Sequence, residues 1–397
     1  MQDFRQYDFQ NKVAIVRVDF NVPLHKETAI VTDDKRIRAA IPTIQHILKQ
    51  GGSVRLLSHF GRPKNGPEAR FSLRQVLPCL ENLLGMPVMF CDSFAVETTS
   101  EMQETVQPGS VVLYENVRFN SEEPKGGMGF AETLSKLGDC YVNDAFGAAH
   151  RAHASTTQLA SFFPNDKMMG FLMEAEVQNA KKILDNPLNP FVAIIGGAKV
   201  SDKILIIENL LNIASDIIIG GGMAYTFAKA LGGDIGNSLY EPERIEKVNE
   251  ILALAKSKKV NIHIPVDSVL AHSFSEIAEV MFADTQSIPS GWMGLDIGPK
   301  AITEFEQIIK KSKTILWNGP MGVFEWSSFE NGTKQVAMAV CEATRNGSYS
   351  LIGGGDSAAA IAKFGLENDV SFVSTGGGAL LEYFEGKSLP GIMALEN

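Results

Sequence analysis

The feature that most constrains the fold is a strand that runs through glycines into a helical pattern, FVAIIGGAKVSDKILIIE at residues 191–208. The apolar run 191–195 is typical of a fully buried strand, and the glycines at 196–197 interrupt it. The spacing that follows predicts a helix that begins at Lys199 and carries Lys203 on the same face. Free backbone N–H groups at a helix start favour an anion, so we predict a phosphate site. The alternative is two solvated lysines on an ordinary helix face.

The second half of the chain repeats this pattern with triple glycines at 220–222, 353–355 and 376–378. A single such run is explained by helix capping or tight packing. Three runs, each between a predicted strand and a predicted helix, indicate backbone amides that approach a phosphate chain. Asp356 adds an oxygen ligand suited to Mg²⁺. The predicted strands here are 191–195, 216–219, 261–264, 314–317, 349–352 and 370–374.

The first half also alternates between strand and helix patterns, which implies parallel βαβ units. Its predicted strands are 13–18, 54–57, 88–90, 111–113 and 141–143, and its predicted helices are 38–50, 73–84 and 129–137. A chain of 397 residues is too long for one ordinary core. We therefore expect an α/β fold of two Rossmann-like parallel-sheet domains joined by a long interdomain helix. The expected boundaries are 1–166 for the first domain, 167–185 for the helix, 186–380 for the second domain and 381–397 for a tail.

Polar side chains follow the strands of the first domain, where parallel sheets bind their ligands. They are Asp19, Asn21, His59, Arg62, Arg118, His150 and Arg151, with Arg36 just before the first predicted helix. Ten of the twelve arginines lie within residues 1–165. Because arginine captures carboxylate and phosphate in a bidentate manner, this domain is predicted to hold a small polyanion.

Several of these residues have structural alternatives. Asp19 is equally well explained as an Asx-turn residue after a strand, and His59 as a buried, hydrogen-bonded histidine, although Arg62 nearby favours a site. Packing is the better explanation for His150 and His153. For Asp144 a structural role is favoured over ligand binding.

Composition excludes several classes of protein. A net charge of −10 argues against general nucleic-acid binding. We find no secretory signal, no apolar run long enough for a membrane span and no metal-type spacing of the four cysteines, so a soluble cytoplasmic protein is expected. The missing export signal also disfavours a periplasmic anion-binding protein. No G-x-x-x-x-G-K-[ST] occurs, and the first predicted strand is not followed by G-x-G-x-x-G.

Eight segments in order along the chain are specific enough to identify a family. They are RVDFNVP (17–23), SHFGRP (58–63), ENVRF (115–119), NDAFGAAHRAHAS (143–155), GGAKVSDKI (196–204), NGPMGVFE (318–325), GGGDSAAA (353–360) and STGGGALLE (374–382). With them the chain resembles the phosphoglycerate kinase family along essentially its whole length. Phe60, Ala148 and Ser357 depart from the commonest residues of the family, but none of them removes a functional group.

The resemblance implies reversible phosphoryl transfer between 1,3-bisphosphoglycerate and ADP, giving 3-phosphoglycerate and ATP with Mg²⁺. It implies a triose-phosphate site on the first domain, a Mg-nucleotide site on the second, closure of the two, a tail that returns to the first domain, and a monomer. The implied substrate residues are Asp19, Asn21, Arg36, His59, Arg62, Arg118 and Arg151. The implied nucleotide residues are Lys199, Lys203, Gly294, Glu325, Gly353, Gly354, Gly355, Asp356 and Ser357, with Asp356 positioning the metal.

The catalytic roles are expected to fall on Arg36, Lys199 and Lys203, with backbone donors at Gly376 and Gly377. Such a reaction needs no nucleophilic side chain, because the carboxylate and the nucleotide phosphate are already nucleophiles. Catalysis then consists of alignment and charge neutralisation.

Overall fold

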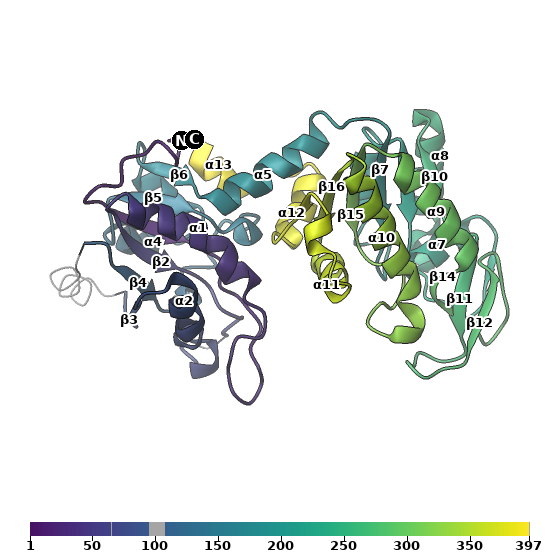
Figure 1. The fold of residues 1–397 in the computed structure, drawn as a ribbon, viewed down its shortest axis with the longest axis horizontal. Coiled ribbons are helices and arrows are strands. Elements are labelled where there is room, and N and C mark those ends of the chain that lie inside the picture. Colours follow the sequence, from purple (N-terminus) through teal and green to yellow (C-terminus); the bar gives the residue numbers. More distant parts are fainter. Residues whose placement is uncertain (65, 95–107, 397) are drawn as a thin grey trace. The chain divides into compact units, whose positions relative to one another are not determined.

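The chain forms two compact units in the computed structural model, which describes residues 1–64, 66–94 and 108–396 (Figure 1). Unit 1 comprises Met1–Val177 and Ser388–Asn397, and unit 2 comprises Gln178–Lys387. The division falls inside helix α5 (Phe171–Leu184), which therefore supplies residues to both units. Asn397, the last residue of the expected tail, lies outside the described residues.

Unit 1 is built on a six-stranded sheet in which every paired strand is parallel, in the order β3-β4-β2-β1-β5-β6. The strands are β1 (Val13–Arg17), β2 (Ser53–Leu57), β3 (Met89–Cys91), β4 (Val111–Tyr114), β5 (Cys140–Asn143) and β6 (Lys167–Met169). Alternate residues face opposite sides, so Val16 and Leu56 enter one hydrophobic core. Helices α1 (Lys35–Lys49) and α2 (Leu77–Leu84) contribute Ile44 and Leu80 to this core, whereas α4 (Met128–Ser135) packs with the 3₁₀ turn Gln158–Phe162.

Unit 2 repeats the arrangement with a parallel sheet in the order β10-β8-β7-β15-β16-β17. Trp317 and Ile194 of adjacent strands are fully buried against Phe305 and Val340 of two neighbouring helices. The strands are β7 (Phe191–Ile195), β8 (Asp216–Ile219), β10 (Asn261–His263), β15 (Thr314–Asn318), β16 (Tyr349–Gly353) and β17 (Phe372–Val373). The helices are α6 (Ile204–Leu210), α7 (Met223–Ala230), α8 (Ile245–Lys258), α9 (Pro299–Lys311), α10 (Asn331–Arg345), α11 (Gly355–Lys363) and α12 (Gly378–Phe384).

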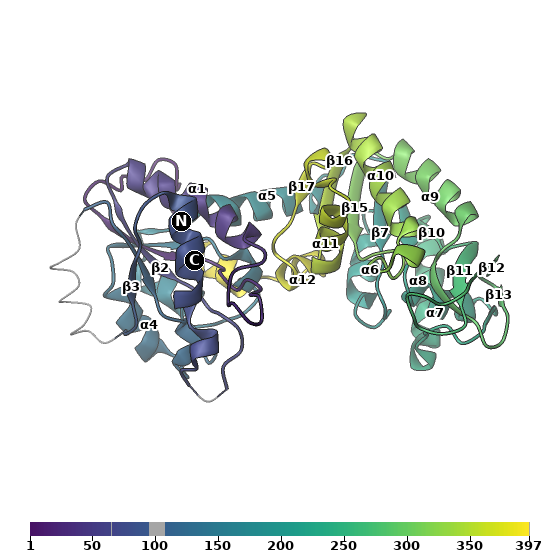
Figure 2. The ribbon, with the colours of Figure 1, turned by 60° about the horizontal axis from the view of Figure 1, so that its bottom comes forward.

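Two small sheets in unit 2 were not expected from the sequence. Strand β11 (Asp267–Ala271) pairs antiparallel with β12 (Val280–Asp284) and β14 (Met293–Ile297), and β9 (Asp234–Ile235) pairs with β13 (Ser287–Ile288). They pack on α7, where Tyr225 contacts Leu270, and Figure 2 shows them beside that helix. On β12, Val280 and Phe282 are exposed, whereas Met281 and Ala283 pack against the small core around Leu270, so this edge strand is buried on one face only.

Helices α5 and α6 begin later in the chain than predicted. Residues 167–169 form β6, paired with β5, and the helix begins only at Phe171, after Gly170. A Cβ at Gly170 would lie 2.3 Å from Asp144 Oδ1, so the chain needs glycine where it turns from strand to helix. The helix predicted from Lys199 begins at Ile204 instead.

The physical reason for the late start of α6 is a competing set of hydrogen bonds. The Ser201 hydroxyl donates to Glu241 Oε1 at 2.6 Å and its amide donates to Glu241 Oε2 at 2.9 Å. These bonds hold the segment that contains Lys199 in turns, and Lys203 becomes the N-cap residue of α6. The two lysines therefore do not share a helix face. Arg36, expected just before a helix, lies in the first turn of α1.

The C-terminal segment packs on unit 1, as helix α13 (Pro390–Glu396) shows in both ribbon views (Figures 1 and 2). The Gly391 amide donates to Ala149 O at 2.8 Å, and Lys167 Nζ donates to Ala394 O at 3.0 Å. The return begins at Ser388 rather than at residue 381, because α12 belongs to unit 2.

Candidate functional site

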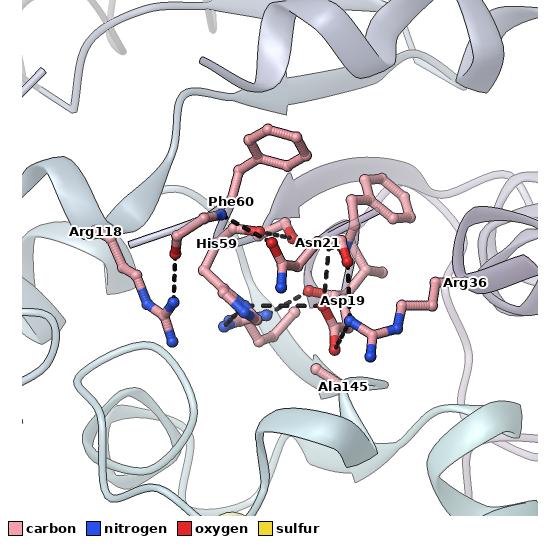
Figure 3. A network of polar contacts seen from close by, with 12 residues as sticks. Asp19, Asn21, Arg36, His59, Phe60, Arg118 and Ala145 are labelled. Atoms are coloured by element: carbon pink, nitrogen blue, oxygen red, sulfur yellow. Dashed lines mark hydrogen bonds and ion pairs between the residues drawn. The ribbon is translucent and has the colours of Figure 1, made fainter. Parts of the chain in front are cut away.

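The substrate residues predicted for unit 1 lie just after the carboxyl ends of its strands, except Arg36, which lies in the first turn of α1. Figure 3 shows Asp19, Asn21, Arg36, His59 and Arg118 of this set. Asp19 and Asn21 follow β1, His59 and Arg62 follow β2, Arg118 follows β4 and Arg151 follows β5. Because these strands are parallel neighbours, their ends meet at one edge of the sheet. We call these residues, with Arg36 and the buried Arg17, the arginine cluster.

Asp19, Asn21 and Arg36 are bonded to one another. Arg36 Nη1 donates to Asn21 O at 2.9 Å and lies 3.3 Å from Asp19 Oδ2. The Asn21 amide donates to Asp19 Oδ1 at 3.1 Å, which is the Asx-turn contact expected as an alternative role for Asp19. Asn21 Oδ1 accepts from the Gly61 amide at 2.8 Å, so it ties the loops after β1 and β2 together. The turn and the cluster are thus one structure.

His59 is buried at the centre of this network. Its Nδ1 lies 3.2 Å from Arg17 Nη2 and 3.9 Å from Asp19 Oδ1. Burial holds the pKa of His59 well below its ordinary value, and the charges of Arg17, Arg118, Arg36 and Arg151 lower this pKa further. His59 is therefore neutral at physiological pH, and its 3.9 Å approach to Asp19 is not an ion pair.

The other arginines differ in how firmly they are held. Arg118 Nη1 donates to Gly61 O at 2.6 Å, and burial, followed by the charges of Arg151 and Arg17, lowers its pKa to about 10. Arg151 Nε donates to His150 Nε2 at 3.0 Å, and Arg62 is exposed. Like charges placed this close repel one another, and a multiply charged anion would relieve that repulsion.

Unit 2 contains a cavity of about 540 Å³ at the glycine turns. The predicted residues Gly294, Glu325 and Asp356 line it. A Cβ at Gly294 would lie 1.8 Å from Tyr225 Oη, so only glycine fits beside that ring. The apolar walls of this cavity were not predicted, because their residues come from separate segments that meet only in the folded chain. These walls include Tyr225, Leu239, Phe274, Met293, Met321 and Val323.

Lys203 lies next to this cavity, with its Cε 3.9 Å from the position of a Cβ on Gly197, which is one of the lining residues. Lys203 Nζ donates to Asn318 Oδ1 at 2.5 Å, and Asn318 Nδ2 donates to Gly353 O at 2.7 Å. Burial lowers the pKa of Lys203, and the nearby charges of Asp202, Asp356 and Glu385 oppose that shift. Lys199 is exposed.

The predicted glycine turns lead into helices α11 and α12. Asp356 is exposed in the first turn of α11, where the N-terminal amides favour negative charge. Ser357 is buried, and its Oγ accepts from the Gly319 amide at 2.5 Å, so it braces two turns. The Gly376 amide donates to Ser374 Oγ at 3.0 Å, and Gly377 precedes α12.

A divalent cation would find a limited set of protein ligands here. In the described ranges, no three His, Cys, Asp or Glu side chains gather into a metal-binding group. Asp356 at the cavity offers one carboxylate, which fits Mg²⁺, since this ion is commonly held by one or two carboxylates and substrate phosphates.

No helix among the described residues has the length and apolar character needed to cross a bilayer.

Together, one α/β unit with clustered arginines and a second with a glycine-lined cavity and an adjacent lysine define a class, the kinases of small anionic substrates. The family model described as phosphoglycerate kinase matches residues 3–387. The phosphoglycerate kinase of Porphyromonas gingivalis is 48% identical over 415 aligned residues, covering 98% of this chain and 99% of that one.

Solved structures agree with this match. Phosphoglycerate kinase from Coxiella burnetii has a TM-score of 0.89 at 39% identity, covering 98% of this chain and 97% of that one. The Pyrococcus horikoshii OT3 enzyme has a TM-score of 0.82 at 31% identity, with 100% and 98% covered. The chain belongs to the phosphoglycerate kinase family. It is a glycolytic kinase that transfers a phosphoryl group between 1,3-bisphosphoglycerate and ADP, which confirms the expected fold and reaction.

Proposed function

We propose that the arginine cluster of unit 1 binds 3-phosphoglycerate and 1,3-bisphosphoglycerate. Arg62, Arg118 and Arg151 hold the phosphate that is not transferred, while Asp19 and Asn21 hydrogen-bond the carbon backbone. His59 contributes a neutral polar contact, and Arg36 reaches the carboxyl end that accepts the phosphoryl group. The observation that carries this assignment is that four buried or half-buried arginines converge on one sheet edge. They are Arg17, Arg36, Arg118 and Arg151.

The cavity of unit 2 is proposed to bind the Mg-nucleotide. Its apolar walls and Gly294 suit a flat base, and Glu325 suits a ribose hydroxyl. Lys199 and the turn Gly353–Gly355 hold the phosphates, and Ser357 supports that turn through Gly319. Asp356 would hold Mg²⁺ carried by the nucleotide phosphates. When bound, that ion supplies charge neutralisation on the phosphate oxygens.

Arg36 and Lys203 are proposed to contact the phosphoryl group while it is transferred, and the amides of Gly376 and Gly377 are proposed as further hydrogen-bond donors to it. The Gly376 amide must then exchange its bond to Ser374 for one to the phosphoryl oxygen. These donors stabilise charge on the equatorial oxygens, and no side chain forms a covalent intermediate.

Because the two ligands are assigned to different units, in-line transfer requires hinge closure between them. We propose that the enzyme acts as a cytoplasmic monomer without membrane or nucleic-acid partners, a setting that the net charge of −10 supports with respect to nucleic acid.

The test compares two arginines of the same helix. Arg36→Ala should lower kcat by about two orders of magnitude while ADP still binds, as measured by a coupled assay and by calorimetry. Arg38→Ala is the matched control, because Arg38 is exposed and its side chain forms an ion pair with Asp34, four residues before it on the surface of the same helix end. Its kcat and KM should stay close to those of the parent enzyme. Loss of ADP binding in Arg36→Ala would refute the assignment of ligands to units.

A further inference from the structure

Beneath the arginine cluster, a chain of buried polar side chains connects Glu123 to His59. The Ser155 hydroxyl donates to Glu123 Oε1 at 2.6 Å, and the Ser155 amide donates to Glu123 Oε2 at 2.9 Å. Arg17 Nε donates to Ser155 Oγ at 2.8 Å, and Arg17 Nη2 lies 3.2 Å from His59 Nδ1. Glu123, Ser155 and Arg17 have no exposed surface, and His59 is 6% exposed.

The donors and acceptors in this chain leave one consistent arrangement of protons. Ser155 has a single hydroxyl proton, which it gives to the Glu123 carboxylate, so its lone pairs are free to accept from Arg17 Nε. Arg17 Nη1 donates to Val18 O. With Nε and Nη1 both engaged, the plane of the guanidinium is set and its Nη2 is directed at His59 Nδ1.

A guanidinium can only donate, so His59 Nδ1 must accept, and the proton of the neutral ring is on Nε2. The competing arrangement places a proton on Nδ1 and directs it at Asp19 Oδ1. That separation of 3.9 Å is too long for a hydrogen bond.

A cationic ring is disfavoured by the charges that face it. In the described part of the chain, Asp19 is the one carboxylate with an oxygen within 4 Å of a nitrogen of the His59 ring. The charges of Arg17, Arg118, Arg36 and Arg151 all oppose a further positive charge on that ring. Glu123 lies behind Ser155 and is connected to the ring through Ser155 and Arg17.

We propose that Glu123, Ser155 and Arg17 are positioning residues that hold His59 as the neutral Nε2–H tautomer, so that His59 meets the anionic substrate as a hydrogen-bond donor. The placement of His59 in the triose-phosphate site rests on the proposed function, whereas its tautomer does not. The arginines then supply the charge for anion capture, and His59 supplies a donor whose protonation does not change between pH 5 and 8, the range in which an ordinary histidine titrates.

The first experiment measures the tautomer directly in the full-length protein. Histidine labelled with ¹⁵N and long-range ¹H–¹⁵N correlation spectra distinguish the two tautomers and the cation. The His59 signals, among those of seven histidines, are assigned by their loss in His59→Gln. We expect an Nε2–H pattern that stays unchanged from pH 5 to 8. An Nδ1–H pattern, or a ring that becomes cationic anywhere between pH 5 and 8, would overturn the proposal.

The second experiment breaks the chain at its centre. Ser155→Ala removes the acceptor of Arg17 Nε, and we expect His59 to show mixed tautomers and the KM for 3-phosphoglycerate to rise about tenfold, as for the loss of one hydrogen bond. The KM for ATP should not change. Ser161→Ala is the matched control, because Ser161 is exposed and its hydroxyl donates to Gln158 O, three residues before it.

The outcomes separate this inference from the proposed function. A Ser155→Ala protein whose His59 keeps a pure Nε2–H pattern would refute the positioning role. Mixed tautomers with an unchanged KM for 3-phosphoglycerate would support the positioning role and refute the placement of His59 in the substrate site. If Ser155→Ala does not fold, the spectra of the parent protein still decide the tautomer.

Discussion

Lys203 is a partly buried lysine whose ammonium group donates to Asn318 Oδ1 at 2.5 Å. A cation that is already held in place gains most when negative charge develops beside it, as it would beside the proposed position of the transferred phosphoryl group, because no reorganisation is then needed. We predict that Lys203→Ala lowers kcat by about two orders of magnitude and changes the Kd for ADP only modestly. Single-turnover kinetics and calorimetry would measure the two quantities.

Lys199 provides the contrast for this prediction, because it is exposed and is assigned to nucleotide already bound. Lys199→Ala should raise the KM for nucleotide more than it lowers kcat. Near-normal turnover of the Lys203→Ala protein would show that Lys203 does not stabilise the transition state, whatever the kinetics of Lys199→Ala.

Residues at the ends of strands were predictable, because a parallel sheet brings successive strand ends to one edge. Asp19, His59 and Arg118 were located in this way. Arg17 was not assigned a role, because it lies inside β1, where neighbouring residues are apolar and a charged side chain gives no positional signal. Its function becomes visible only when Ser155, far along the chain, is placed against it.

At the level of elements, the N-terminus of α5 is held by Asp144 and Thr43. The Met173 amide donates to Asp144 Oδ1 at 3.0 Å, and the Phe171 amide donates to Thr43 Oγ1 at 3.0 Å. Asp144 is fully buried, and burial raises its pKa to about 6 from 3.8. This agrees with the structural role that the sequence favoured for Asp144.

The raised pKa of Asp144 predicts a specific pH dependence of stability. Between pH 4 and 6 the carboxyl group of Asp144 binds its proton more tightly in the folded state than in the unfolded state. The stabilisation of the folded state by protonated Asp144 is therefore fully present below pH 4 and is lost as the pH rises through 6. The loss amounts to about 3 kcal/mol for a shift of this size. Asp144→Asn keeps an acceptor for Met173 without the charge.

Urea unfolding at several pH values would measure the free energy of unfolding for both proteins. The parent protein should lose more stability between pH 4 and 7 than Asp144→Asn does. Parallel stability curves for the two proteins would contradict the shifted pKa. Because other groups titrate in both proteins alike, the difference between the curves isolates Asp144.

Helix α13 supports the loop that carries Arg151. A Cβ at Gly391 would lie 3.0 Å from Ala149 Cα, so the backbone of one of the two segments would have to shift by a few tenths of an ångström. Gly391→Ala should therefore destabilise unit 1 by about 1–3 kcal/mol, as overpacking does, and raise the KM for 3-phosphoglycerate. Denaturant unfolding and steady-state kinetics test this. Met393→Ala, an exposed change on the same helix, should leave both quantities nearly unchanged.

Helix starts were the weakest part of the sequence-based prediction, for a physical reason. An apolar period shows where a helix can form, whereas its first residue depends on competing hydrogen bonds. Ser201 and Glu241 delay α6, and Asp144 with Gly170 delays α5. Both sets of bonds join residues distant in sequence or need a backbone turn, so no local pattern reveals them.

For the whole molecule, the assignment of the two substrates to different units predicts a ligand-dependent change of size. Small-angle scattering with 3-phosphoglycerate and Mg-nucleotide together should give a smaller radius of gyration than either ligand alone. The Arg36→Ala protein, with both ligands at saturation, tests whether closure depends on that contact. A radius that is the same with both ligands as with none would contradict a closing mechanism.

The division of the chain also has a consequence for its synthesis. Unit 2 is one continuous segment, Gln178–Lys387, whereas unit 1 includes residues from Ser388 onward. A ribosome therefore finishes unit 2 before it supplies the residues that pack against Ala149 and Lys167. During synthesis the N-terminal domain of a protein usually completes its folding first. In this chain unit 1 is completed last, because its C-terminal residues are translated after unit 2. The arginine cluster obtains its final support from the part of the chain that is translated after both sheets.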